Sequence, residues 1–209
     1  MRFTLVSDGS SDQALIPAIK WLLVEHGAGE GIDGRWADFR HLIKPPVGLK
    51  DKIIKAIDLY PCDLLCVHRD AENAAHEIRK QEIDDIVEQL SNENLLQMPA
   101  ICVVPIRMLE AWLLMDESAI RRAAGNPKGK MPLGLPRINR LESVADPKRI
   151  LFDALEIASG LRGRRLAKLN FPALRYRVAD LISDHAPLRN LSAFKMLEAD
   201  ISGFMEALE

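Results

Sequence analysis

The sequence of 209 residues has only three cysteines, which leaves little basis for disulfides or for a zinc site. Its three cysteines, Cys62, Cys66 and Cys102, cannot all pair, and each lies in or beside an apolar run. We therefore expect buried free thiols in a reducing compartment and no disulfide framework. Because the Cys62-x-x-x-Cys66 pair has no second pair of ligands downstream, a zinc site is not expected.

Long hydrophobic runs are also lacking. No apolar stretch approaches the roughly 18 residues that a membrane-spanning helix needs. The acidic residue Asp8 comes too early in the chain for a secretion signal. With 48% hydrophobic and 28% charged residues, the composition is that of an ordinary globular protein, and we expect a cytoplasmic protein without membrane contact.

Several well-known catalytic and nucleotide-binding motifs are missing. The chain has no GxxxxGK[ST] loop, no GxGxxG after a predicted strand and no GxSxG. The turn Asp8-Gly9-Ser10 lacks the second aspartate, two residues on, of a haloacid-dehalogenase-like phosphatase. A receiver domain would be shorter and would have no basic helical extension. These absences set aside the corresponding enzyme and signalling classes.

Aromatic residues are scarce, at 5% of the chain, and no aromatic-rich basic motif indicates base stacking. We expect Trp21, Trp36 and Trp112 in the core or at its edge. Charge is present but uneven: residues 1–105 carry 11 Lys and Arg against 17 Asp and Glu, whereas residues 121–177 carry 14 against 4. This asymmetry favours a polyanionic partner such as nucleic acid, and its alternative is a solvated helical surface.

Strand and helix patterns alternate through about residue 120. Continuous apolar runs predict buried strands, and a helix that begins at Ser10, in the capping box Ser10-Ser11-Asp12-Gln13, follows the first of them. The alternation predicts an α/β fold with a mostly parallel sheet flanked by helices. The expected strands are 3–6, 36–43, 63–67 and 101–104, and the expected helices are 10–26, 49–59, 73–90 and one that opens near Met108.

After residue 124 the pattern becomes helical. We expect an α/β domain over residues 1–124, a Pro- and Gly-rich linker over 125–146, and an all-helical C-terminal region over 147–209. Helices are expected at about 148–159, 165–183 and 188–208. One apolar stripe of the last helix is expected in the core, and it consists of Phe194, Leu197, Ile201, Phe204, Met205 and Leu208.

Polar residues follow the predicted strands and would meet at one edge of the sheet, where ligands bind in open parallel sheets. They are Asp8, Asp12, His68, Asp70, Glu72 and Glu110. Carboxylates suit Mg²⁺ or Mn²⁺, and a pair of such ions can assist phosphoryl transfer. Each residue also has a simpler interpretation. The acidic residues could be turn or helix-cap residues, and His68 could be a strand-end histidine that only makes a hydrogen bond. Glu110 lies in so apolar a run that it needs a partner or a metal.

These residues resemble the motifs of TOPRIM-related proteins. In that family a first strand ends in an acid-glycine turn with another acid four residues on, as in Val6-Ser7-Asp8-Gly9-Ser10-Ser11-Asp12. A later strand ends in Asp-x-Asp, and Val67-His68-Arg69-Asp70 stands for it here. More narrowly, the chain resembles the TOPRIM-like family called domain of unknown function 4276. That likeness covers nearly the whole chain and rests on Pro105–Leu114, Asp146–Leu151 and Pro187–Phe194.

The resemblance implies metal-dependent cleavage or transfer of phosphodiesters, a setting in anti-phage or mobile-element defence, and an ATPase partner protein. The resulting hypothesis is a nuclease that depends on Mg²⁺ or Mn²⁺. Asp70 would be the central ligand, and Glu110 would bind metal or act as general base. The expected catalytic residues are Asp8, Asp70 and Glu110, and the other metal ligands are His68 and Glu72. The expected phosphate-binding residues are Arg107, Lys148, Arg149, Arg164 and Arg165.

Two departures from the family pattern favour a different hypothesis. Asp8 stands where the family usually has Glu, and His68 stands where it has the first Asp of Asp-x-Asp. A histidine binds Mn²⁺ more readily than Mg²⁺. The alternative is therefore a catalytically degenerate module that binds nucleic acid or a partner ATPase. A third hypothesis is a structural protein whose acidic residues are only caps and turns.

Overall fold

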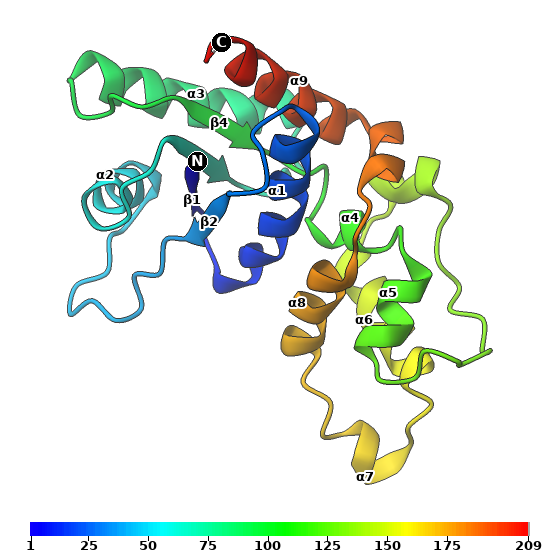
Figure 1. Cartoon of the computed structure of the whole chain (residues 1–209). Coiled ribbons are helices and arrows are strands. Elements are labelled where there is room, and N and C mark those ends of the chain that lie inside the picture. The colour runs from blue at the N-terminus through cyan, green and yellow to red at the C-terminus, as the bar shows by residue number, and fades with distance from the viewer. Residues whose placement is uncertain (209) are drawn as a thin grey trace.

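The computed structural model describes residues 1–208 and shows an α/β sheet followed by a largely helical half (Figure 1). The sheet has four strands in the order β2-β1-β3-β4, and every neighbouring pair is parallel. The predicted α/β fold class is confirmed. The strands are β1 (Arg2–Val6), β2 (Asp33–Trp36), β3 (Leu64–His68) and β4 (Ala100–Val103).

Helices flank this sheet and build the rest of the chain. The α-helices are α1 (Ile16–Glu25), α2 (Leu49–Leu59), α3 (His76–Asn92), α4 (Glu110–Leu113), α5 (Glu117–Ala123), α6 (Pro147–Ser159), α7 (Gly163–Leu166), α8 (Phe171–Leu181) and α9 (Ser192–Glu206). The 3₁₀-helices are η1 (Ser10–Leu15), η2 (Ile138–Ser143) and η3 (Ala186–Asn190). No helix within residues 1–208 is long and apolar enough to cross a membrane.

Alternate residues of each strand pack into two different hydrophobic clusters, as the two-residue repeat of a strand requires. On β3, Leu64 and Cys66 belong to one cluster, and Leu65 and Val67 belong to the other. The second cluster packs on α2 and α3, and the first packs on α1, α9 and the helical half. Both faces of the sheet are therefore covered, which explains why β1, β3 and β4 are largely apolar.

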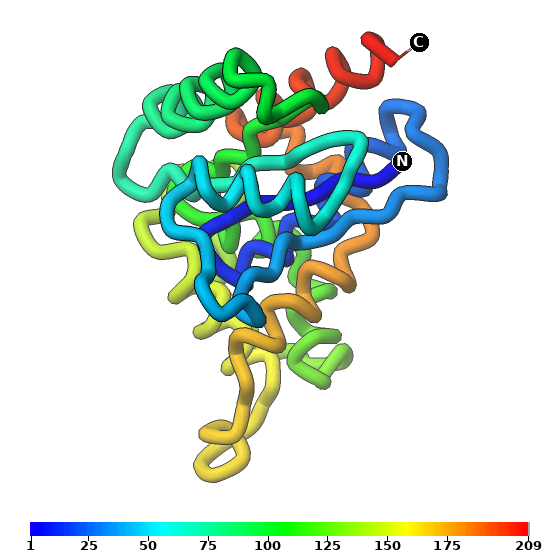
Figure 2. The backbone as a smooth tube through the Cα atoms, turned by 90° about the vertical axis from the view of Figure 1, so that its left-hand side faces the viewer, coloured from blue at the N-terminus to red at the C-terminus, as the bar shows by residue number. Residues whose placement is uncertain are grey.

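The helical half shares its core with the sheet. One cluster of buried residues runs from β1, β3 and β4 through α1 into α4, α5, α6, α8 and α9. The segment 125–146 also contributes to this cluster, through buried Leu133 and Leu141. Helix α7 lies at the end of the helical half farthest from the sheet in both views (Figures 1 and 2).

Near the N-terminus, one expected strand is wrong in its bounds and one expected helix cap is wrong. The second strand is Asp33–Trp36 rather than 36–43, because its backbone pairs with β1 in the register Arg2 to Asp33 through Leu5 to Trp36. The helix after β1 begins as η1, and its N-cap is Gly9 rather than Ser10. The Asp12 carboxylate accepts a hydrogen bond from the Gly9 N–H, at 3.0 Å, and so replaces the expected Ser10–Gln13 box.

Two later helices that the sequence predicts as continuous are each divided in two, because a polar side chain caps the start of the second part. The expected helix over 165–183 is α7 plus α8, because Asn170 caps α8 by accepting from the Ala173 N–H. The helix expected near Met108 is α4 plus α5, and Asp116 caps the second of them. The stripe on α9 is buried at Phe194, Leu197 and Ile201, but Leu208 lies beyond the helix and is 60% exposed.

Candidate functional site

The strand order places a topological switch point between β1 and β3. Strand β2 lies on one side of β1, and strands β3 and β4 lie on the other. The connections therefore diverge at the C-terminal ends of β1 and β3, which is where open α/β sheets bind their ligands. Beyond these ends lies a cavity of about 350 Å³. Its lining residues are Asp8, Gly9, Ser11, Asp12, His68, Arg69, Asp70, Glu72 and Arg79.

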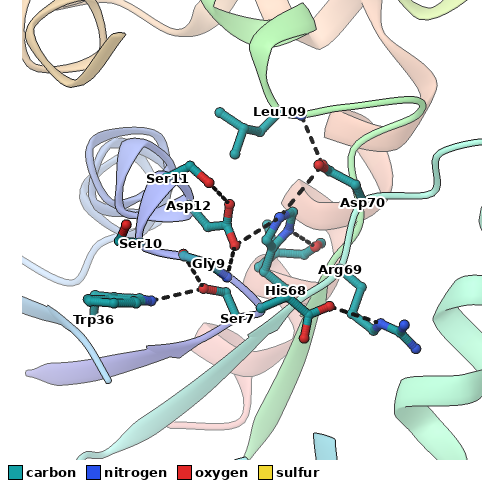
Figure 3. Close-up of polar contacts among 12 residues, drawn as sticks. Ser7, Gly9, Ser10, Ser11, Asp12, Trp36, His68, Arg69, Asp70 and Leu109 are labelled. Carbon is teal, nitrogen blue, oxygen red and sulfur yellow. Dashed lines mark hydrogen bonds and ion pairs between the residues drawn. The ribbon is translucent and has the colours of Figure 1, made fainter. Parts of the chain in front are cut away.

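Asp12 reaches the cavity from η1. Its Oδ2 accepts from the Gly9 N–H, and its Oδ1 accepts from the Ser11 hydroxyl at 2.9 Å (Figure 3). The side chain is nearly buried, at 9% exposure. These two hydrogen bonds fix the carboxylate at the turn that ends β1 and direct it toward His68.

His68 is the last residue of β3 and is fully buried in the site. Its Nδ1 lies 2.8 Å from the backbone oxygen of Val103, which can only accept, so Nδ1 carries the proton. Burial lowers the pKa of His68 below its usual value, although nearby Asp12 opposes the shift. The neutral ring therefore presents the lone pair of Nε2, which lies 4.0 Å from Asp12 Oδ2 and 3.6 Å from Asp70 Oδ1.

Asp70 completes this group on the far side of His68 (Figure 3). Its Oδ1 accepts from the Leu109 N–H at 2.9 Å, which ties the loop after β3 to the loop after β4. Burial, together with the neighbouring carboxylates of Glu110 and Asp12, raises the pKa of Asp70 to about 8. Asp70 is thus protonated at neutral pH unless a cation takes the place of its proton.

Asp8 is directed away from this group, toward basic residues. Its carboxylate lies 2.7 Å from Lys52 Nζ and 3.6 Å from Arg69 Nε, and its side chain is 62% exposed. Partial burial opposes ionisation, but the hydrogen bond and charge of Lys52 and the charge of Arg69 outweigh it, so the pKa of Asp8 lies below its usual value. Asp8 therefore lies at the rim of the cavity and is ionised at neutral pH.

Glu110 has a protein partner that the sequence pattern did not reveal. Arg175 on α8 donates from Nη1 to Glu110 Oε1 at 2.6 Å, and the two side chains are 7% and 3% exposed. The next residue, Tyr176, donates from its hydroxyl to the backbone oxygen of Ser10. Helix α8 thus contacts the loops after both β1 and β4. The ion pair with Arg175 gives the buried Glu110 carboxylate a partner of opposite charge.

Glu72 and Arg107 have backbones in the left-handed region, with φ of +53° and +67°. The Glu72 N–H donates to the Arg107 backbone oxygen at 2.9 Å, so the loops after β3 and β4 hold each other in this conformation. Arg107 Nη1 donates to Asn73 Oδ1 at 2.7 Å. Non-glycine residues adopt such angles at a cost and often do so at functional sites. Both residues line a second cavity of about 310 Å³ beside the first.

The other expected phosphate-binding residues are spread over the surface. Lys148 and Arg149 are exposed in the first turn of α6, and Ala145, just before that helix, lines the second cavity with Arg107. Arg164 and Arg165 are exposed on α7, at the far end of the helical half (Figure 2). The structure therefore groups Arg107 with the start of α6 and separates α7 from them.

The residues of this site fit a divalent cation in kind. Two carboxylates and a histidine nitrogen with a free lone pair are ligands for Mn²⁺, and the bond from His68 Nδ1 to a backbone oxygen is typical of metal-binding histidines. Within residues 1–208, however, no three His, Cys, Asp or Glu side chains already lie together as a metal-binding group. The nearest carboxylate oxygens, of Asp12 and Asp70, lie 4.0 and 3.6 Å from His68 Nε2, so these three side chains would hold such an ion.

Comparisons with protein families, with curated proteins and with solved structures each find no match to this chain. The functional argument therefore rests on the geometry of the site.

Proposed function

We propose that this chain is a TOPRIM-like phosphodiesterase that uses Mn²⁺ or Mg²⁺ and acts on nucleic acid. The observation that carries the proposal is the position of His68 Nε2, whose lone pair lies between the carboxylates of Asp12 and Asp70 at the switch point of the sheet. Three observations support it: the side chains are of types that bind divalent cations, the His68 tautomer leaves Nε2 free of a proton, and the group lies where open α/β sheets bind ligands.

In this proposal His68, Asp70 and Glu72 keep their expected metal-binding role and Asp12 joins them. Asp12, His68 and Asp70 would hold the ion, and Glu72 at the cavity rim could join them. Bound there, the ion would polarise a phosphodiester and stabilise its developing charge. Arg69 and Lys52, which pair with Asp8, can bind substrate phosphates at the rim. Glu110 instead holds Arg175 and supports the loop that donates to Asp70.

A calorimetric titration with Mn²⁺ tests the metal site. We expect the wild-type protein to bind Mn²⁺ and Asp70→Asn to bind it at least tenfold more weakly, because the amide oxygen carries no charge while it keeps the hydrogen bond from Leu109. Affinity should rise between pH 6 and pH 9, since the Asp70 carboxyl, with a pKa of about 8, must lose its proton on binding.

The matched control is Asp180→Asn, which changes an exposed aspartate on α8 and should leave the Mn²⁺ titration unchanged. Equal affinities for the wild type and Asp70→Asn would contradict the metal site. A site that binds Mn²⁺ without any cleavage of DNA or RNA would contradict the enzymatic part of the proposal.

A second function, binding without catalysis, is favoured by the salt bridges themselves. Glu110 is neutralised by Arg175 and Asp8 by Lys52, so two of the three expected catalytic acids already have cationic partners. In this case the chain would bind nucleic acid, or a partner ATPase, through the same edge. Cleavage in Mn²⁺ but not in Mg²⁺ would favour the enzyme, and binding with no cleavage in either would favour this alternative.

Charge reversal on α7 tests the nucleic-acid surface. We expect Arg164→Glu/Arg165→Glu to weaken DNA or RNA binding and to lower the slope of log K against log salt by about 2, because each phosphate contact contributes about 1 to that slope. Fluorescence anisotropy from 50 to 200 mM salt gives both quantities. The control is Lys195→Glu on α9, which should not change the slope. An unchanged slope in the double variant would remove α7 from the binding surface.

A further inference from the structure

A separate cavity lies on the other side of the loop that ends β1. It has a volume of about 240 Å³ and is bounded by the end of β2, the loop 37–48 and the start of α2. In Figure 1 this loop extends away from the sheet. In Figure 3 Trp36 lies beside Ser7 and Ser10, across the β1 loop from His68 and Asp70. Asp8 lines both this cavity and the candidate metal site, so the two adjoin.

The walls of this cavity offer flat surfaces. Trp36 is partly exposed, and its Nε1 donates to the Ser7 hydroxyl at 2.9 Å, which holds the ring against the end of β1. The guanidinium carbon of Arg40 lies 5.1 Å from the centre of the Trp36 ring. Arg40 is itself held by Asp38 through two side-chain hydrogen bonds, at 2.8 and 2.6 Å. Aromatic rings and guanidinium planes are the surfaces on which unpaired bases stack.

The surroundings also suit a group that carries a phosphate. Although residues 1–105 are acidic overall, residues 40–55 carry five Lys and Arg and one Asp. Lys52 lines the cavity, and its Nζ lies between the Ser7 backbone oxygen and Asp8 Oδ1, where the two cavities adjoin. A cation in that position can bind a backbone phosphate. That phosphate would link a nucleoside whose base lies in one cavity to the neighbouring nucleotide in the other.

From this juxtaposition we propose that the Trp36 cavity binds one unpaired nucleobase of the substrate. The inference rests on the proposed function, since it places the base beside the phosphodiester that the metal site would act on. A volume of about 240 Å³ lies below the range of about 300–1,000 Å³ that accommodates drug-sized ligands, so the occupant is a small group of the size of one base. The substrate class is then single-stranded or locally unpaired nucleic acid, or a free nucleotide of the same chemistry.

The test compares strands with and without bases in the presence of EDTA, so that metal binding plays no part. The probes are a 12-nucleotide oligothymidylate and an abasic strand of the same length, followed by fluorescence anisotropy and by quenching of tryptophan emission. We expect the wild type to bind oligothymidylate about tenfold more tightly than the abasic strand, in keeping with the stacking of one base. Quenching should accompany oligothymidylate only.

Variants assign the effect to the cavity. Trp36→Leu should bind oligothymidylate about tenfold more weakly and the abasic strand unchanged, and Trp36→Phe, which keeps a flat ring, should retain most of the difference. Arg40→Gln should lose part of it. Circular dichroism checks that each variant is folded. The comparison of the two strands with the wild-type protein does not depend on any variant. Competition with thymidine monophosphate that depends on Trp36 would identify the free nucleotide as the ligand; competition by the strand alone would identify nucleic acid.

Equal affinities of the wild type for the two strands would overturn the base cavity, as would a base preference that Trp36→Leu retains in full. These outcomes are distinct from failure of the proposed function. Base-dependent binding without any Mn²⁺ site would leave the cavity intact and remove the enzyme. Mn²⁺ binding that depends on Asp70, without any base preference, would leave the metal site intact and remove the base cavity.

Discussion

We expect Arg175→Met to lower the free energy of unfolding by about 3–5 kcal/mol, because it leaves the buried Glu110 carboxylate without its partner. Both side chains of the pair are almost wholly inaccessible, at 7% and 3% exposure, so water cannot replace the guanidinium. Native domains are stable by about 5–15 kcal/mol, and the loss is therefore a large part of the total. Urea unfolding at pH 7 measures it.

The control for this prediction is Arg177→Met, since Arg177 is exposed two residues away on the same helix and should change stability little. The double variant Glu110→Gln/Arg175→Met should recover a good part of the loss, because a neutral amide costs less to bury than an unpaired carboxylate. If Arg175→Met is as stable as Arg177→Met, the ion pair does not stabilise the fold.

Asp70→Asn is expected to increase stability, and the increase should grow with pH. Burial raises the pKa of Asp70 to about 8, whereas an aspartate in the unfolded chain ionises near 3.9. Between these values the folded protein binds one more proton than the unfolded chain. The contribution of Asp70 is therefore complete below about pH 4 and is lost as the pH rises to 8.

Four pH units at about 1.4 kcal/mol each set an upper limit of about 5.6 kcal/mol for this loss. We expect the variant to match the wild type near pH 4 and to exceed it by about 3–5 kcal/mol at pH 8 to 9, measured by urea unfolding in EDTA. Titrating groups distant from residue 70 are common to both proteins and cancel in the difference. Asp180→Asn is the control, and its difference from wild type should be small at every pH. A difference for Asp70→Asn that does not vary with pH would show that the carboxyl ionises normally.

Much of the fold could be predicted because its strands are buried on both faces. The runs near residues 3–6, 63–67 and 101–104 are apolar throughout, and all three are strands in the structure. Strand β2 was misplaced because Asp-Gly-Arg-Trp has no apolar pattern, and its strand character comes only from pairing with β1. Gly9 was missed as a cap because the capping side chain, Asp12, hydrogen-bonds to a backbone N–H that any residue could supply.

The candidate site was predictable in part for a related reason. Parallel strands bring their C-terminal ends to one edge, so the approach of Asp12, His68 and Asp70 follows from strand order. The partners of the remaining acids could not be foreseen. Arg175 is 65 residues from Glu110, and Lys52 is 44 residues from Asp8. One basic side chain among many in a helical pattern has no local signal that marks it as a partner.

Helix α8 holds together two loops at the edge of the sheet that carries the site. Its neighbouring residues Arg175 and Tyr176 hold Glu110 and Ser10, which follow β4 and β1 respectively. These strands are not adjacent, since β3 lies between them. The sheet by itself leaves the two loops independent, and α8 joins them as a rigid spacer. Displacing this helix would therefore free the loop after β1, which carries Asp12, from the loop after β4, which donates to Asp70 through Leu109.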